Sequence, residues 1–171
     1  ATNNSLFRSS DAGANWTLVN SGEHMEIELK PDDSNIIYSV KKSGNNTLFY
    51  KSLDNGLTWV LKPNGWPVSA TGDEQKRCEI TVSADNPLLI YVLASGVVGV
   101  NTGLYGIYKS TDAGENFTFE CCDGSPGGTP SLTNPNILGW SEDGSEEGGQ
   151  VYYDLAMAAS PTNSDKVFAS G

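Results

Sequence analysis

The chain has 171 residues, enough to bury a substantial core, and its 19 glycines and 8 prolines suit a β-rich protein with many turns. Its 21 acidic residues outnumber 10 basic ones, and the net charge of −11 argues against a nucleic-acid surface and favours a soluble, extracellular one. No apolar run approaches the roughly 18 to 20 residues of a membrane helix, so we expect no membrane insertion. The first residues lack a signal-peptide profile, so a secretion signal would lie upstream or have been removed.

An eight-residue pattern, S-x-D-x-G-x-x-(W/F), occurs three times along the chain, each time between two short apolar and aromatic runs. An Asp can accept hydrogen bonds from following main-chain N–H groups, and Gly adopts a positive φ, so the pattern predicts a tight turn between two strands. The Asp is therefore expected to be structural, and the closing aromatic to be buried between sheets. The residues of this repeated turn are Ser9, Asp11, Gly13 and Trp16, then Ser52, Asp54, Gly56 and Trp59, then Ser110, Asp112, Gly114 and Phe117.

A second recurrence is an alternating strand, a turn rich in Pro, Asp and Asn, and another strand. Residues 25–38 align without gaps on 78–91, and a third copy spans 155–168. Period-two alternation predicts strands with one buried face. Together with the hairpins, the two repeats predict four-stranded units, with strands at 5–9, 16–19, 24–30, 35–41, 47–52, 58–62, 77–83, 88–95, 104–110, 116–120, 151–159 and 166–170.

The predicted fold class is all-β, a β-propeller segment of four-stranded antiparallel blades. We expect a single segment over 1–171, composed of a half blade at 1–20, blades at 21–62 and 77–120, and a half blade at 150–171. Propellers typically close with four to eight blades, so a fragment of a larger propeller is expected. The expected partners are the remaining blades of a parent chain or another copy of this one.

The repeated turn resembles the Asp-box, or BNR, repeat of sialidases, xyloglucanase-type glycosidases and sortilin-like receptors. In those families the box is structural and joins the two outer strands of a propeller blade. The run from Gly148 to Leu155, followed by Pro161, is also similar to a segment of large secreted repeat proteins of Bacteroidetes-type bacteria. The resemblance implies an extracellular or cell-surface protein.

Insertions accumulate in the connection that leaves each unit's last strand, and the longest spans 121–149. Insertions in repeat folds commonly lie on the binding face. Aromatic rings beside carboxylates are typical of sugar-binding clefts, although a plain packing role is the alternative. The candidate ligand-binding residues in or beside this connection are Trp140, Asp143, Tyr152, Tyr153 and Asp154.

The same connection is acidic, and clustered carboxylates can bind calcium. The candidate ligands are Glu142, Asp143, Glu146 and Glu147, but the EF-hand spacing is absent and a solvated loop is the alternative. No other cofactor is expected.

Three cysteines, Cys78, Cys121 and Cys122, match no zinc pattern. We expect free, partly buried thiols, with a bridge from Cys78 to one of the vicinal pair as the alternative. The single histidine, His24, makes a Ser-His-Asp triad improbable.

Two functions from different classes fit this sequence. The first is a noncatalytic extracellular propeller segment that recognises or displays a glycan or protein ligand. The alternative is part of a glycoside hydrolase acting on extracellular polysaccharide. Arg8 and Arg77 are too few for the arginine triad of the sialidases that the repeat resembles, and no motif singles out a catalyst among the acidic residues.

Overall fold

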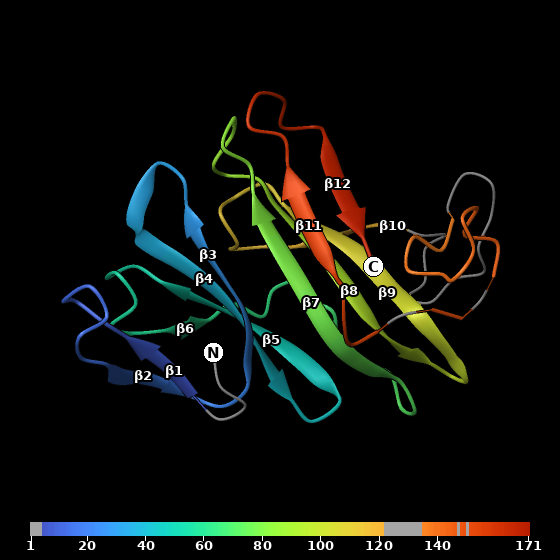
Figure 1. Ribbon diagram of the computed structural model, residues 1–171, viewed down its shortest axis with the longest axis horizontal. Helices are drawn as coiled ribbons and strands as arrows, with labels where there is room; N and C mark the ends of the chain where they lie inside the picture. The colour runs from blue at the N-terminus through green and yellow to red at the C-terminus, as the bar shows by residue number, and fades with distance from the viewer. Residues whose placement is uncertain (1–4, 122–134, 147, 150) are drawn as a thin grey trace.

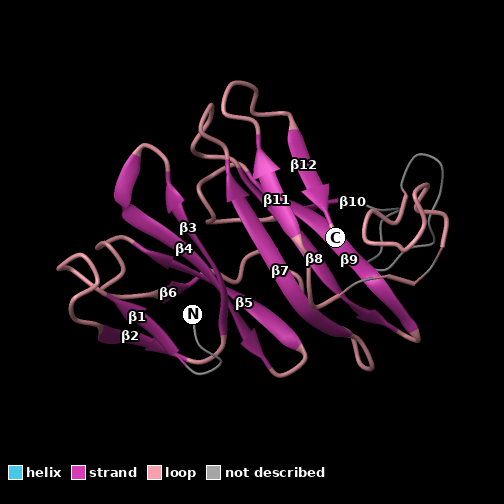
Figure 2. Ribbon diagram, viewed as in Figure 1, coloured by secondary structure: helices cyan, strands magenta, loops and turns pink. Residues whose placement is uncertain are grey.

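The computed structural model describes residues 5–121, 135–146, 148, 149 and 151–171, and strands and loops make up all of this described chain (Figure 2). None of the described residues forms a helix that could cross a membrane. The strands are β1 (Ser5–Arg8), β2 (Thr17–Ser21), β3 (His24–Lys30), β4 (Asp33–Ser43), β5 (Asn46–Ser52), β6 (Val60–Leu61), β7 (Glu74–Val82), β8 (Ile90–Val98), β9 (Asn101–Ser110), β10 (Thr118–Cys121), β11 (Ala156–Ala159) and β12 (Val167–Ser170).

The strands form two four-stranded antiparallel sheets, β3-β4-β5-β6 and β7-β8-β9-β10, and two strand pairs, β1-β2 and β11-β12. Each four-stranded sheet follows chain order, because every connection is a hairpin. The sheets fan out side by side, with the first strands β3, β7 and β11 adjacent and the two strand pairs at opposite ends (Figure 1). The predicted four-stranded antiparallel sheets are therefore present.

The strand β11 is shorter than predicted. It begins at Ala156, whereas the sequence predicted a strand from residue 151. The carbonyls of Val151 and Tyr152 accept hydrogen bonds from the Ser95 hydroxyl and the Arg77 guanidinium instead of from a neighbouring strand. Over these residues, hydrogen bonds from side chains of the adjacent sheet thus replace the main-chain hydrogen bonds of a strand pair.

The three repeated turns have the same geometry. In the second, the Ser52 hydroxyl donates to Asp54 at 2.8 Å and accepts the N–H groups of Asp54 and Gly56. The Asp54 carboxylate also accepts the main-chain N–H and the hydroxyl of Thr58. Both oxygens of the Asp54 carboxylate thus accept hydrogen bonds from within the turn.

The main core lies between the two four-stranded sheets and is rich in aromatic rings. Phe49 stacks on Trp66 at 5.1 Å between ring centroids, and Phe117 meets both rings edge-on at 4.8 and 5.0 Å. Aromatic pairs favour these offset and edge-to-face arrangements. The segment after β6 is thereby tied into the core by Trp66.

The closing aromatics of the three turns differ in exposure, which corrects the prediction that all would be buried. Phe117 is buried and Trp59 is half-buried, but Trp16 is 62% exposed. A neighbouring sheet covers Phe117, whereas no described sheet lies beyond β1-β2 to cover Trp16. Burial of this position therefore depends on the adjacent sheet and is not a property of the turn.

The cysteines also differ from expectation. Cys78 is a free thiol and fully buried, so it does not form the bridge considered from the sequence. Burial raises the pKa of its thiol to about 12. Cys121 is disulfide-bonded, which corrects the expectation of a free thiol there, and Cys122 lies outside the described residues.

Candidate ligand-binding surface

The connection between β10 and β11 is organised around one buried amide. Its described residues, 135–146, 148, 149 and 151–155, are called here the aromatic connection. The Asn136 side chain donates to the carbonyls of Glu146 and Gly148, both at 3.1 Å, and accepts the N–H of Leu138. The Asn136 main-chain N–H donates to the Gly144 carbonyl at 2.8 Å. One asparagine thus holds two passes of the chain together.

The aromatic connection is anchored to the sheet beneath it. Leu138 and Leu155 are buried against Leu93 of β8 in a small core cluster. The Ser95 hydroxyl binds the Val151 carbonyl at 2.8 Å, and the Thr102 hydroxyl reaches the Gly149 carbonyl at 3.4 Å. This anchoring gives the exposed side chains of the connection a defined support.

Three of the candidate residues expose large aromatic side chains to solvent. Trp140, Tyr152 and Tyr153 are 73%, 50% and 70% exposed. The Tyr152 and Tyr153 rings lie 6.2 Å apart between centroids, and the Lys76 ammonium lies 5.3 Å from the Tyr152 ring centroid. No ring contact joins Trp140 to either tyrosine among the described residues. Tyr152 and Tyr153 therefore form one aromatic face, and Trp140 is a separate ring on the same connection.

Asp154 follows this aromatic face in an uncommon conformation. Its φ is +62°. The other described non-glycine residues with positive φ are Ala12, Asn55 and Ala113, which occupy the same position in the three repeated turns. An Asp tolerates the left-handed region better than most residues do. The carboxylate of Asp154 is exposed beside Tyr153, so it is available to a polar ligand group.

Two acidic residues of the connection, Asp143 and Glu146, are engaged locally. Asp143 accepts the Ser145 N–H at 3.1 Å and the Ser141 hydroxyl at 3.2 Å, and hydrogen bonds from Ser145 and Ser141 lower the pKa of its carboxyl. The Glu146 carboxylate accepts the N–H and hydroxyl of Ser141. Glu142 is exposed.

The described residues include no cluster of acidic side chains that would support the calcium hypothesis. Across these residues, no group of three or more His, Cys, Asp or Glu side chains is placed to hold a metal ion. Glu147 lies outside the described residues.

A second group of ionisable residues, not singled out from the sequence, lies on the adjacent first strands β3 and β7. Burial, followed by the neighbouring Glu79 carboxylate, raises the pKa of Glu26 well above its ordinary range. The Arg77 guanidinium holds Glu79 at 2.5 and 2.7 Å. Burial also raises the pKa of Glu28. The gapless alignment of 25–38 on 78–91 places Glu26 on Glu79, and that equivalence was the available signal.

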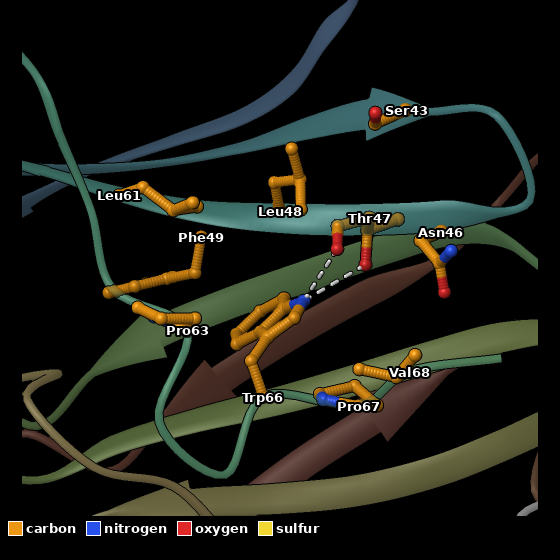
Figure 3. A pocket seen from close by; sticks show the side chains of 10 residues that line it. All are labelled: Ser43, Asn46, Thr47, Leu48, Phe49, Leu61, Pro63, Trp66, Pro67 and Val68. Carbon is orange, nitrogen blue, oxygen red and sulfur yellow. Dashed lines mark hydrogen bonds between the residues drawn. The ribbon is translucent and has the colours of Figure 1, made fainter.

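A small apolar pocket of about 230 Å³ lies beside β5, where the chain leaves β6 (Figure 3). Its lining includes Leu48, Phe49, Leu61 and Trp66. Phe49 and Trp66 are buried, and the volume is below the roughly 300–1,000 Å³ of typical ligand pockets. We therefore assign this pocket to packing at the sheet edge.

The sequence singled out Trp140, Tyr152 and Tyr153 as candidates but missed the groups that support the main chain around them. Asn136, Ser95 and Arg77 brace the main chain of the aromatic connection. No local pattern marks Asn136, because its partners lie about ten residues away along the chain. Arg77 could have been noted as a cation at the end of the shorter insertion, the one between β6 and β7.

Comparisons with known proteins support the fold. No family model and no curated protein matches the chain. Among solved structures it is similar to the Niastella koreensis GH74 enzyme, with 23% sequence identity and a TM-score of 0.50. The match covers 71% of this chain and 19% of that one, so the chain spans about a fifth of that enzyme's length. With the four-stranded antiparallel sheets, this likeness identifies the fold as a β-propeller segment, in which each sheet is a blade.

Proposed function

We propose that this chain, as a β-propeller segment, belongs to a secreted or cell-surface protein and recognises a glycan or protein ligand without catalysing its turnover. The observation that carries the proposal is the exposed aromatic face of Tyr152 and Tyr153 on an anchored connection, with Trp140 on the same connection. Contiguous exposed apolar patches mark binding sites more than single exposed residues do, and the neighbouring Tyr152 and Tyr153 rings form such a patch. We further propose that the repeated turns belong to the Asp-box type and serve the fold.

The electrostatics favour an uncharged ligand such as a neutral polysaccharide over an anionic one. The cations beside the aromatic face are already paired, Lys76 with Glu74 and Arg77 with Glu79. The chain as a whole carries a net charge of −11, which repels polyanions. Tyrosine and tryptophan rings supply contact area together with a polar group, and this combination suits sugar rings.

Several of the described carboxyl groups are already engaged within the chain. Retaining and inverting glycosidases hold their two carboxyls about 5 Å or more apart, on either side of the scissile bond. Glu79 is already bound by Arg77, and burial raises the pKa of Glu26. Asp143 is used within its own turn.

The alternative function is a contribution to the active site of a glycoside hydrolase. The fold likeness to the Niastella koreensis GH74 enzyme favours keeping this alternative. At 23% identity the likeness concerns the fold, and it transfers no substrate to this chain.

The proposal is tested by presenting the chain to an array of neutral and acidic polysaccharides and of extracellular proteins. We expect binding to one or more neutral glycans, weakened at least about tenfold in the double variant Tyr152→Ala/Tyr153→Ala. A tenfold loss corresponds to about 1.4 kcal/mol, a reasonable contribution for two exposed aromatic rings.

The matched control is Leu53→Ala, which removes another exposed apolar side chain in the turn between β5 and β6. This variant should bind as the native chain does. Equal binding by the native chain and the double tyrosine variant would remove the aromatic face from the binding site. Binding to acidic glycans alone would contradict the charge argument.

A further inference from the structure

Residues 152–154, called here the display turn, are three consecutive exposed residues between two buried ones. On one side, Val151 is buried and its carbonyl accepts a hydrogen bond from the Ser95 hydroxyl at 2.8 Å. On the other side, Leu155 is buried against Leu93. Because both ends are fixed to the sheet beneath, the display turn presents its side chains from a defined base.

Two consecutive residues of β7 hold Tyr152 in place. The Arg77 guanidinium donates to the Tyr152 carbonyl at 3.3 Å, and the Lys76 ammonium lies over the Tyr152 ring, 5.3 Å from its centroid. The register of β7 with β8 shifts at Lys76, and a bulge of this kind re-aims a side chain. Glu74 binds Lys76, and Glu79 binds Arg77. Tyr152 is thus fixed through its main chain and its ring by cations that are themselves paired.

Tyr153 is the more exposed of the two rings. It is 70% exposed, against 50% for Tyr152, and the two rings are inclined at 46° to each other. Among the described residues, no cation lies over the Tyr153 ring and no group is hydrogen-bonded to its hydroxyl. Tyr152 is therefore engaged within the chain, whereas the Tyr153 ring is free to contact a ligand.

Asp154 places a carboxylate next in sequence to Tyr153, and the fold makes no described use of it. No residue in the described part of the chain donates a hydrogen bond to this carboxylate. Its φ is +62°, but Ala12 and Ala113 adopt a φ of 57° in the repeated turns, so such a conformation needs no carboxylate. Asp143, by contrast, accepts two hydrogen bonds within its own turn. The Asp154 carboxylate is therefore available to a ligand.

An uncharged sugar ring matches a phenol ring next to a carboxylate. One face of a pyranose presents C–H groups, which pack on an aromatic ring, and hydroxyl groups surround its edge. A hydroxyl that donates to a carboxylate forms a hydrogen bond about twice as strong as one to a neutral acceptor. A carboxylate on the sugar would instead be repelled by the carboxylate of the display turn. The same two groups therefore attract a neutral sugar and reject an acidic one.

We propose that Asp154 is a specificity-determining residue of this surface. Its carboxylate accepts hydroxyl groups of a sugar ring that packs on Tyr153, and it thereby selects uncharged sugar units with free hydroxyl groups over uronic acids. Lys76 and Arg77 are positioning residues that act through Tyr152. This inference rests on the proposed function, with a neutral glycan as the ligand.

Asp154→Asn tests this role, because asparagine has nearly the same size, tolerates the same backbone conformation and carries no charge. The probe is the neutral polysaccharide that the native chain binds most tightly on the array. It is used untreated and with part of its primary hydroxyl groups oxidised to carboxylates. We expect Asp154→Asn to weaken binding to the untreated probe about three- to tenfold, and to lower the ratio of the affinities for the untreated and oxidised probes at least about threefold. A disturbed turn would weaken binding to both probes alike.

Two control variants separate the carboxylate from the backbone and from net charge. Asp154→Gly keeps a residue that adopts a positive φ and removes the acceptor, so it should weaken binding to the untreated probe at least as much as Asp154→Asn does. Asp165→Asn removes an exposed carboxylate in the turn between β11 and β12, which is the same change in charge at another place. This variant should keep the native affinities for both probes.

The outcomes distinguish this role of Asp154 from the proposed function. A native affinity ratio in Asp154→Asn, with binding still weakened in Tyr152→Ala/Tyr153→Ala, would overturn the role of Asp154 and leave glycan recognition in place. An equal fall of the ratio in Asp165→Asn would also overturn it, because net charge alone would then account for the selectivity. Absence of binding by the native chain to every glycan of the array would overturn glycan recognition, and the role of Asp154 with it.

Discussion

Lys51 reaches from the blade β3-β4-β5-β6 to the blade β7-β8-β9-β10. There its ammonium lies 2.8 Å from the Glu115 carboxylate and 2.9 Å from the Ala113 carbonyl. The Lys51 side chain is only 7% exposed, whereas that of Glu115 is 42% exposed. Glu115 also binds Lys62 at 2.6 Å. One carboxylate thus joins two lysines of one blade to the repeated turn of the next.

Because the Lys51 charge is buried, Glu115→Gln should destabilise the fold. We expect a loss of about 1–2 kcal/mol in the free energy of unfolding by urea, less than for a fully buried pair because solvent screens Glu115. Lys62→Met, which removes the more exposed lysine of the pair, should cost under about 1 kcal/mol. Unchanged stability of Glu115→Gln would show that this clamp does not hold the blades together.

The serine of the repeated turn should matter most where it is buried. Ser110 is fully buried, donates to Asp112 and accepts the N–H groups of Asp112 and Gly114. Ser110→Ala should cost about 1–3 kcal/mol, because two N–H groups lose their acceptor away from water. Ser9→Ala removes the same hydrogen bonds at an exposed turn and should cost distinctly less by urea unfolding. Equal losses would contradict the role assigned to burial.

The Trp66 indole should contribute a hydrogen bond as well as packing. Its N–H donates to the Thr47 carbonyl at 3.0 Å, on the edge of β5 that β6 leaves uncovered. The Gln75 side chain accepts the Thr47 N–H at 3.2 Å and so caps the same edge. Trp66→Phe keeps an aromatic ring and loses the donor, so we expect a loss of about 1–3 kcal/mol in thermal or urea unfolding. A change below about 0.5 kcal/mol would contradict the capping role.

Stability should decline as pH rises because of Glu26. Burial and Glu79 raise the pKa of Glu26 from 4.5 to about 8, so the folded chain retains a proton that the unfolded chain has released. This contribution is complete below pH 4.5 and is lost as pH rises through about 8. Burial lowers the pKa of His24 from 6.5 to about 4, which has the opposite effect on stability between those values. The Glu26 effect should therefore be measured above pH 6.5.

Glu26→Gln imitates the protonated carboxyl and should flatten the decline in melting temperature between pH 6.5 and 8.5. The control is Glu23→Gln, which removes an exposed glutamate next to β3 and should keep the native slope. A native slope in Glu26→Gln would mean that another group causes the decline.

The fold was predictable from the sequence because its information is local and repeated. Ser52 and Asp54 specify a turn through side chains that bond to their own neighbours, and Gly56 supplies the positive φ. The alignment of 25–38 on 78–91 depends only on period-two alternation, which matches the pleat of a strand. Three copies of each pattern leave little freedom for a different arrangement of strands.

The exposure of Trp16 and the support of the aromatic connection were not predictable in the same way. Whether Trp16 is buried depends on which sheet lies beside β1-β2, and the turn sequence does not specify that sheet. Asn136 acts through carbonyls brought to it by an irregular chain path, so its residue type alone gave no signal. Trp140, Tyr152 and Tyr153 could be named as candidates, since insertions and aromatic residues are visible without coordinates, but their exposure could not be predicted.

The most direct test of noncatalytic recognition is the release of new reducing ends from a bound polysaccharide. The chain, and any longer protein that contains it, should be incubated with the glycans that it binds, and the reducing ends counted over many hours. Our account predicts binding that Tyr152→Ala/Tyr153→Ala weakens, with no reducing ends above the protein-free control. Reducing ends that increase with protein concentration and time would contradict it and favour the glycoside hydrolase alternative.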